Sequence, residues 1–428
     1  SDSGLGPHLS SVLLRHACAG SAQHLLRSTL QSDAAVGRYD HVVVESWERL
    51  TGHKFSNEQR VQATLPMKEG GLAMGAAWPR REAAFIGSWH ACTPSVCEVL
   101  GIDDARALQD CATNALSSLR AAAADFAAKC SARSADELVA LGASSARQTQ
   151  RLLTNALLET YRTRLLASLP QASAARLRSA GGPNSSGFLQ PPTDPSERMT
   201  PNAWRLACRR RLLCNLCTTV AHEAQQTHCQ HHNGSAGVIC GTELDADGHH
   251  AAICGCGGGV TATHDTARDY IKVWLEERVN GQVWKEQHIP ELDRLVTKPD
   301  GTRVLEKAVM DVVWTHDGQR HLLDVTFVTP TSDNARYLKE RASHDGAAAK
   351  SAESGKRGKY PSPQLVPFAV ETFGRPGEAA LQFVRQWCLD SADAAGFWRR
   401  ISAIIQNGAA HQLVSASVPA ASRASALA

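Results

Sequence analysis

The sequence predicts an α+β protein: a helical N-terminal region, a small Cys/His-rich element, and then a mixed central sheet flanked by helices. Three observations support this fold class. Over the first part of the chain, apolar residues recur at helical spacing between short polar breaks. Cysteine and histidine concentrate in one glycine-rich loop further on. Beyond that loop, short runs of β-branched residues alternate with stretches of helical period.

The same patterns predict the domain boundaries. Residues 1–178 form the helical region, and 179–198, rich in Gly, Pro and Ser without any period, form a linker. A helix and the Cys/His loop follow in 199–262. The domain that contains the sheet is predicted to span 263–407, and 408–428 to be a disordered tail.

Helices account for most of the expected elements before the sheet. The helical period is clearest over 9–30, 39–52 and the alanine-rich 116–130, and a further helix is expected to begin near Arg81. After the linker, a helix is predicted around Trp204–Leu216.

The stretch HDTARDYIKVWLEERV, residues 264–279, opens the predicted sheet domain with a helix. It carries an apolar stripe opposite a charged face, which is typical of a helix packed on a core. The stripe consists of Ala267, Tyr270, Ile271, Trp274 and Leu275.

The remaining elements of the domain follow from short apolar runs and turn residues. Strands are predicted at 282–289, on both sides of an HDGQ turn within Met310–Val325, and at 365–373. Helices are predicted at about 333–352, 377–388 and 394–405, with the basic segment SGKRGKYPSP following the first of them.

Composition restricts the class of protein. A length of 428 residues with 43% hydrophobic content is typical of a soluble protein with more than one domain. The net charge of +3 is too small to indicate a nucleic-acid binder by itself, so a basic surface has to be local, as at Arg209, Arg210 and Arg211. Thirteen cysteines beside 18 histidines favour metal binding in a reducing, intracellular compartment. No apolar stretch approaches the ~20 residues of a membrane helix.

The loop from Cys229 to Gly259 has the composition of a structural zinc site. Zinc takes four Cys or His ligands, and a polar loop that cannot bury a core gains most from such an ion. Cys240, His250 and Cys254 supply three ligands. The fourth is open among Cys229, His231, His232 and Cys256, of which Cys229 is included in the predicted set. The alternative is a surface loop in which Cys and His merely co-occur.

Asp311 and Asp324 are the strongest catalytic candidates. Each stands at the edge of an apolar run, where a carboxylate is costly unless it is paired or bound to a metal. Because paired strands are ~5 Å apart, antiparallel pairing around HDGQ would bring both carboxylates to one ion. Metal-dependent phosphodiester hydrolysis uses such oxygen ligands. The alternative is a pair of ordinary edge-strand carboxylates.

Two neighbouring aspartates are interpreted as turn residues. Asp300 lies in KPDGTR, which has a turn signature and no apolar run after it, and Asp317 precedes Gly318. Glu286, in the strand-like WKEQHI, is either a third metal ligand or an exposed strand residue.

The basic segment after the predicted 333–352 helix supplies the remaining candidates. Lys356, Arg357, Lys359 and Tyr360 are expected to serve catalysis or to contact phosphate. A solvated basic loop is the alternative.

Together these motifs resemble the C-terminal part of non-LTR retrotransposon proteins that carry a restriction-like endonuclease. The resemblance is carried by C…GHHAAIC…GGG…HD…RD, MDVVW…LLDVTFV, ESGKRGKY and FAVETFG. In that family a Cys/His zinc element precedes a nuclease with a PD-(D/E)xK-type fold, whose second aspartate opens a D-V-T strand, as Asp324 does here. Upstream, LPMKEGGLAMGAAWPRREAAFIGSW resembles the segment that follows the polymerase palm.

The resemblance implies a DNA endonuclease that nicks its target so that a linked reverse transcriptase can prime from the free 3′ end. It assigns Mg²⁺ or Mn²⁺ to Asp311 and Asp324, with Glu286 assisting, and structural zinc to the Cys/His loop. It also carries the catalytic lysine, displaced to a later helix in this family, to Lys356, with Tyr360 beside it. The implied partners are target DNA and the element's RNA, and the implied location is the nucleus.

The sequence departs from the family pattern in two places. Met310 stands where a proline precedes the first aspartate, and Cys240 is single where the family has two closely spaced cysteines. The paired aspartates of a polymerase palm are not recognisable, so no polymerase activity is expected. Because residue 1 is a serine, we expect a fragment or a processed product. A decayed module that only binds nucleic acid is the alternative function.

Overall fold

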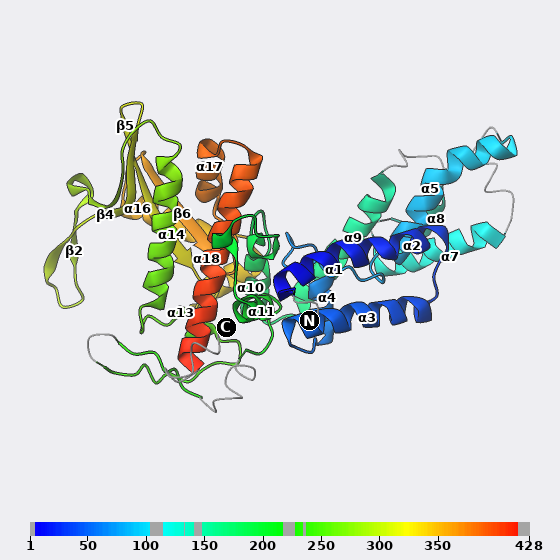
Figure 1. The fold of residues 1–428 in the computed structure, drawn as a ribbon, viewed down its shortest axis with the longest axis horizontal. Helices are drawn as coiled ribbons and strands as arrows, with labels where there is room; N and C mark the ends of the chain where they lie inside the picture. Colours follow the sequence, from blue (N-terminus) through cyan, green and yellow to red (C-terminus); the bar gives the residue numbers. More distant parts are fainter. Residues whose placement is uncertain are drawn as a thin grey trace. The chain divides into compact units, whose positions relative to one another are not determined.

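The computed structural model describes residues 5–102, 114–131, 133–140, 148–216, 227–233 and 237–417. The chain forms two compact units: unit 1 comprises Ser1–Pro66 and Gly71–Leu169, and unit 2 comprises Met67–Gly70 and Pro170–Ala428. Unit 1 is helical, while unit 2 contains a mixed sheet and the Cys/His loop (Figure 1), so the α+β prediction is confirmed. No helix in these described ranges is long and apolar enough to cross a membrane.

Unit 1 consists of helices around a core of small and aromatic side chains. Phe85, Ile86, Leu119, Phe126 and Leu157 are among its buried residues. The helix predicted to begin near Arg81 does so. The helices are α1 (Pro7–Ser21), α2 (Gln23–Ser28), α3 (Asp33–Thr51), α4 (Asn57–Thr64), α5 (Arg81–Leu100), α7 (Asn114–Lys129), α8 (Ala135–Val139) and α9 (Thr149–Ser168).

Unit 2 begins with helical elements that precede the sheet. They are α10 (Gln171–Ala180), the 3-10 turns η2 (Gly187–Leu189) and η3 (Pro195–Glu197), α11 (Pro201–Arg211), α13 (His249–Ile253) and α14 (Gly259–Glu276). The sheet region follows, with β1 (Val283–His288), η4 (Pro290–Leu292), β2 (Arg294–Thr297), β3 (Arg303–Glu306), β4 (Val309–His316), β5 (Gln319–Val328), α15 (Ala335–Ser343), α16 (Ala347–Lys359), β6 (Leu365–Glu371), α17 (Glu378–Trp387) and α18 (Ser391–Ser417).

The central sheet of unit 2 is mixed, with strand order β1-β4-β5-β6. The first three strands are antiparallel, and β6 runs parallel to β5. A parallel neighbour requires a crossover connection, which α15 and α16 provide. The order along the chain is therefore helix, three antiparallel strands of the sheet, crossover helices and a parallel strand.

The β4–β5 hairpin turns at HDGQ, as predicted. His316 pairs with Gln319, so Asp317 and Gly318 form a two-residue loop, with φ of 49° and 75°. Positive φ at both positions is the requirement of a type I′ turn, which Asp-Gly satisfies. The register of the hairpin is thereby fixed.

Both faces of the sheet are covered. On one face, α14, α17 and α18 contribute to a core around Trp274, Trp314, Phe368 and Phe397. On the other, Tyr360 at the end of α16 packs with a smaller cluster that includes Val313, Leu322 and Leu365. Side chains alternate along a strand, so Asp324 belongs to the face of Leu322.

Several predicted boundaries differ from the structure. Unit 1 ends at Leu169, not at 178, because Pro170 ends α9 and α10 packs within unit 2. The predicted linker 179–198 contains η2 and η3, and its Phe188 is buried against the rest of unit 2. Residues 199–262 and 263–407 belong to this same compact unit, and the boundary predicted at 262 lies inside α14.

Two C-terminal elements also differ from the prediction. Helix α18 continues to Ser417, so 408–417 are helical and not a tail, and their Leu413 and Val414 are buried; residues 418–428 lie outside the described ranges. The predicted 333–352 helix is interrupted before Gly346, whose φ is 74°. A second helix, α16, begins after this glycine and continues to Lys359, so the basic segment up to Lys359 is helical and not a loop.

Candidate functional site

Four side chains of the Cys/His loop converge into a group that can hold a metal ion such as zinc: Cys229, Cys240, His250 and Cys254. Their ligand atoms all lie within 4.8 Å of one another. Sγ of Cys229 is 3.9 Å from Sγ of Cys254, and Sγ of Cys240 is 3.4 Å from Nε2 of His250. Tetrahedral zinc with Zn–S bonds of about 2.3 Å places sulfur atoms about 3.8 Å apart. The donor set and its spacing therefore fit zinc.

The loop forms this group with two short pieces of structure. A β-like turn brings Cys229 and Cys240 together, because Gly241 donates to the carbonyl of Cys229 and the backbone N–H of Cys240 to that of His231. His250 lies on α13. Hydrogen bonds with Thr242 lower the pKa of the Cys240 thiol to about 6, which favours the thiolate that binds metal.

The geometry selects Cys229 from the alternatives for the fourth ligand. His231 points elsewhere, with its Nε2 2.7 Å from Oγ of Ser415. His232 and Cys256 are not members of the group. Nε2 of His249, the neighbour of the ligand His250, lies 2.9 Å from Oγ1 of Thr331.

The metal group also packs against the end of α18. Cys229 and Cys254 share a hydrophobic cluster with Leu413 and Ala416. The side-chain amide of Gln412 donates to the carbonyl of Cys254 at 3.2 Å. This packing explains why the predicted tail is helical.

Asp311 and Asp324 lie at the point where the β4–β5 ladder opens. The last pair on that side is Val312 with Leu323, and the two aspartates come next on their strands. Oδ2 of Asp311 accepts a hydrogen bond from the backbone N–H of Val325 at 2.6 Å. The two carboxylates are close enough for each to affect the pKa of the other. The predicted pairing thus brings them together.

Lys356 lies beside this carboxylate pair. Its Nζ is 2.8 Å from Oδ2 of Asp324, a carboxylate that is only 8% exposed. That oxygen has no hydrogen bond with suitable angles in the described residues. Burial raises the pKa of Asp324, and the Lys356 ammonium opposes this effect. A buried carboxylate oxygen with spare acceptor capacity fits a cation ligand.

His264 of α14 is a neighbour that was quoted in the HD…RD motif but was not predicted as a site residue. Its Nε2 lies 3.3 Å from Oδ2 of Asp311, and this contact raises the pKa of His264 to about 9. Burial alone would raise the pKa of Asp311, but the hydrogen bonds from His264 and Val325 lower it overall. An ionised Asp311 and a protonated His264 therefore form a pair.

Glu286 has a different role from the predicted one. It lies between the pairs that Lys285 and Gln287 form with β4, with φ of 53°. Its carboxylate accepts from Nη1 of Arg268 at 2.6 Å. In the described residues it does not join Asp311 and Asp324 in a group able to hold one ion. Here Glu286 is an exposed strand residue, which was the alternative to a third ligand, and it pairs with a buried arginine.

Arg268 joins α14 to β1, because it pairs with carboxylates on both elements. Its guanidinium also contacts Asp265 and Asp269, each at 2.9 Å, and only 7% of its side chain is exposed. His264 and Arg268 are four residues apart on α14, on the same side as Ile271 and Leu275. That spacing, at the start of a helix after the metal loop, is the signal in the sequence that would have found both.

Tyr360 is also corrected. It is 5% exposed and its ring packs in the cluster with Leu322 and Leu365, so it is a core residue on the sheet face to which Asp324 also belongs. Lys359 lies over the Tyr360 ring, 4.9 Å from its centroid, and pairs with Glu306 at 2.8 Å. Arg357 is half exposed on α16, 4.0 Å from Glu353.

The basic cluster predicted to bind nucleic acid, Arg209, Arg210 and Arg211, is buried, with residue exposures of 8%, 7% and 2%. Nη1 of Arg210 donates to the carbonyl of Thr372 at 2.8 Å, and its guanidinium lies over the Phe373 ring. These arginines hold α11 inside unit 2. They are structural, and the prediction of a nucleic-acid contact there is wrong.

Asp300 is a turn residue, as predicted. Its Oδ1 accepts from the backbone N–H of Thr302 at 2.9 Å, and the residue is exposed between β2 and β3. It is therefore not part of the carboxylate pair.

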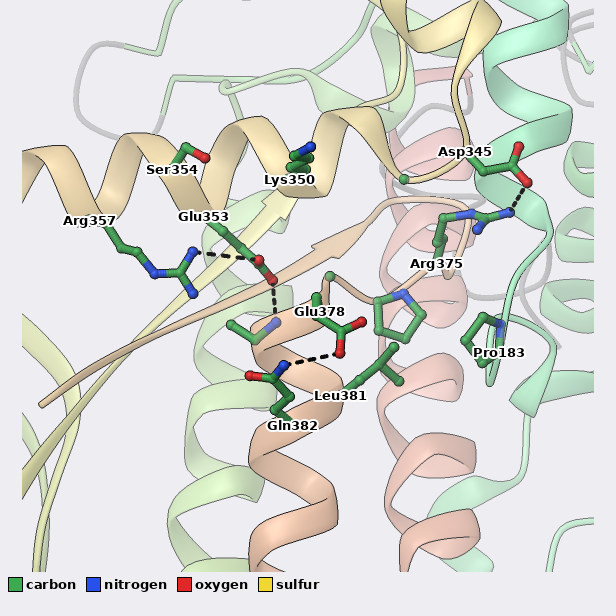
Figure 2. Close-up of a pocket in the computed structure, with 14 residues that line it drawn as sticks. Pro183, Asp345, Lys350, Glu353, Ser354, Arg357, Arg375, Glu378, Leu381 and Gln382 are labelled. Carbon is green, nitrogen blue, oxygen red and sulfur yellow. Dashed lines mark hydrogen bonds and ion pairs between the residues drawn. The ribbon is translucent and has the colours of Figure 1, made fainter. Parts of the chain in front are cut away.

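A separate polar pocket of about 480 Å³ lies along α16 and the start of α17 (Figure 2). Lys350, Ser354 and Arg357 line it from α16, while Glu353 accepts a hydrogen bond from the backbone N–H of Ala379 at 3.0 Å. The N-terminus of α17 is therefore already satisfied by a carboxylate. The pocket carries charges of both signs and does not include Asp311 or Asp324.

The comparisons with known proteins do not add to this geometry. No protein-family model matches the chain, and no curated protein is similar to it at a significant level. What the two groups of side chains can do follows from their chemistry. One is a set of soft ligands suited to zinc, and the other is a carboxylate pair with a lysine and a histidine.

Proposed function

We propose that unit 2 is a metal-dependent DNA endonuclease of the restriction-like type found in non-LTR retrotransposon proteins. The observation that carries the proposal is the carboxylate pair of Asp311 and Asp324 with the ammonium of Lys356 2.8 Å from the latter. Two acidic ligands suit a divalent ion that assists phosphodiester hydrolysis, and a lysine beside them suits the stabilisation of charge on the phosphate.

The topology supports the same proposal. Helix α14 precedes three antiparallel strands, then crossover helices and the parallel strand β6. Lys356 comes from a crossover helix, which agrees with the displaced lysine that the sequence resemblance implies.

Asp311 and Asp324 would hold Mg²⁺ or Mn²⁺, because both offer hard oxygen ligands in a partly desolvated position. When bound, the ion supplies Lewis-acid stabilisation of charge on the phosphate. Lys356 donates hydrogen bonds to the phosphate oxygens, and the contact with His264 orients Asp311. The zinc-type group has a structural role, since it fastens the loop to α18.

The test is a nicking assay on supercoiled plasmid DNA with the full chain, zinc and added Mg²⁺ or Mn²⁺. We expect Asp324→Asn and Lys356→Ala to reduce the nicking rate by at least 10²-fold, a typical effect of losing a group that stabilises the transition state. The matched control is Asp317→Asn, which removes one carboxylate from the exposed two-residue β4–β5 turn, where Asn-Gly is also favourable, and should nick at the wild-type rate. Equal nicking rates for wild type and Asp324→Asn would contradict the assignment of Asp324 to the catalytic site.

A second candidate is a module that binds nucleic acid without cutting it. The pairing of Glu286 with Arg268 favours it, because this removes the third acidic ligand that the sequence suggested. Under this alternative, wild-type chain binds DNA but shows no metal-dependent nicking. The same assay therefore separates the two candidates.

A further inference from the structure

The ribbon formed by β2 and β3 stands apart from the central sheet (Figure 1). It pairs Arg294–Thr297 with Arg303–Glu306 and closes through the turn 298–302. Along both strands every side chain is exposed or only partly covered. An isolated two-stranded hairpin is marginally stable in water. A ribbon held away from the core in this way therefore gains stability from a partner that it contacts.

The ribbon has an apolar pair on one face. Leu295 lies directly opposite Leu305, and the two are 62% and 54% exposed. On the other face Val304 is 38% exposed. Exposed apolar side chains that lie together mark contact surfaces more often than ordinary surface.

The acidic side chain on the strands of the ribbon is already neutralised within the protein. Glu306 lies between Arg294, at 2.7 Å, and Lys359, at 2.8 Å. Asp300 accepts from the backbone of the turn and keeps its charge. It is outnumbered by the basic side chains of the ribbon.

Lys298, Arg303 and Lys307 are further exposed basic side chains. Lys307 interacts with the carboxylate of Asp293, whereas Lys298 and Arg303 form no ion pair within the described ranges. Lys298 and Arg303 lie at the closed end of the ribbon, and Lys307 follows β3. The surplus charge of the ribbon is thus positive, which fits a polyanion.

The base of the ribbon is tied to the candidate catalytic helix. Lys359, which pairs with Glu306, is three residues beyond Lys356 on α16. Anything bound to the ribbon therefore approaches the element that also supplies the lysine beside Asp324.

We propose that the β2–β3 ribbon docks in a groove of duplex DNA. Two-stranded ribbons fit such grooves, exposed cations bind the phosphates on either side, and apolar side chains contact sugars and base edges. In this arrangement Lys298, Arg303 and Lys307 contact phosphates, and Leu295 with Leu305 faces the groove. The choice of DNA rests on the proposed function.

The test measures binding of the full, zinc-loaded chain to a random-sequence DNA duplex over a series of salt concentrations, without added Mg²⁺. We expect K298Q/R303Q to lower the slope of log affinity against log salt by about 1 to 2, because each lost phosphate contact accounts for ~0.9. The matched control R38Q/R385Q removes two exposed positive charges from other elements and should keep the wild-type slope.

A second variant tests the apolar contacts of the ribbon separately from its charges. L295T/L305T replaces the two leucines with threonines, which are β-branched strand formers, and should weaken binding several-fold without changing the salt slope, because no counterion is involved. Wild-type affinity and slope in both ribbon variants, or no DNA binding by the wild type, would overturn the proposal. So would unchanged DNA binding together with reduced self-association of the leucine variant in sedimentation, which would identify a second copy of the chain as the partner.

Binding is measured without cleavage, so the two proposals fail separately. A chain that binds through the ribbon but never nicks contradicts only the nuclease proposal. A chain that nicks while its ribbon variants bind normally contradicts only this one.

Discussion

Burial of charged side chains in unit 2 is tolerated because these side chains pair with specific partners. Arg268 contacts three carboxylates, and Arg210 stacks on Phe373 while donating to a backbone carbonyl. An unpaired buried charge would cost several kcal/mol. Asp324 has Lys356 2.8 Å from its Oδ2, but burial and the neighbouring Asp311 carboxylate raise its pKa, whereas donors lower the pKa of a structural carboxylate such as Asp393. At the residue scale, this is what distinguishes the candidate catalytic carboxylate from structural ones.

Asp393 illustrates the structural kind and gives a prediction on pH. It accepts from Nη2 of Arg278 at 2.6 Å, from Nε1 of Trp274 and from the backbone N–H of Leu389. Burial alone would raise its pKa, but these donors lower it overall. A carboxyl whose folded pKa is lowered stabilises the protein above its ordinary pKa of about 3.8, and this contribution is lost as pH falls through the folded pKa.

We therefore expect D393N to lower the unfolding free energy by about 1 to 3 kcal/mol at pH 7, the range for hydrogen bonds to a charged group. The difference from wild type should narrow as pH falls below about 4, between the ordinary pKa of 3.8 and the lower folded pKa. Urea unfolding at pH 7, 4 and 3 measures it, with D390N as a neighbouring control. A difference that stays constant with pH would mean that the effect comes from packing and not from charge.

The residues of the candidate sites were predictable to different degrees. Spacing identified Cys240, His250 and Cys254, since ligands of one ion lie close along the chain. It also identified Asp311 and Asp324, whose positions follow from a two-residue turn. It could not show that Arg210 is buried, because basic side chains in a helix look alike whether they face solvent or the core.

At the scale of elements, the metal group and α18 depend on each other. Gln412 and Leu413 of α18 contact the Cys/His loop, and the loop itself is short of regular structure. Zinc ligation organises such loops, which rarely hold their shape without the ion. Residues 408–417 should therefore be ordered only when metal is bound.

Removal of zinc by a chelator should increase amide hydrogen exchange in 408–417 while 391–405 stay protected in the main core. C229S should behave like the chelated protein and lose stoichiometric zinc. C256S is the matched control, because Cys256 lies in the same loop but outside the four-ligand group, and it should retain both metal and protection. Equal protection of 408–417 in C229S and wild type would show that packing alone holds the helix end.

Elements with a clear period or turn were predictable, and those defined by distant contacts were not. The β4–β5 hairpin follows from Asp317-Gly318 between two apolar runs. The β2–β3 ribbon has strands of only four residues each, with a single leucine pair on one face, which is too short a pattern to predict them, and only the KPDGT turn marks it. The end of α18 was missed because its partner, the Cys/His loop, lies more than a hundred residues earlier in the chain.

For the whole molecule, the division into two units matters most. The largest cluster of unit 2 is built around its sheet, from Ala267 to Ile405, and the main cluster of unit 1 from Ala83 to Leu157. Each unit has the size of an ordinary domain and its own core. The position of this division was missed because Leu169-Pro170 breaks one helical region into two helices that belong to different units.

Two cores of this kind should unfold in separate steps, and zinc should act on only one of them. In scanning calorimetry we expect two transitions, because cooperativity follows the packed core and not the chain. A ligand that binds only the folded form stabilises the part that binds it. Chelation should therefore lower the midpoint of the unit 2 transition and leave that of unit 1 unchanged. C229S should show the lowered midpoint without chelator and no further shift with it, whereas one transition that moves as a whole would contradict the independence of the two cores.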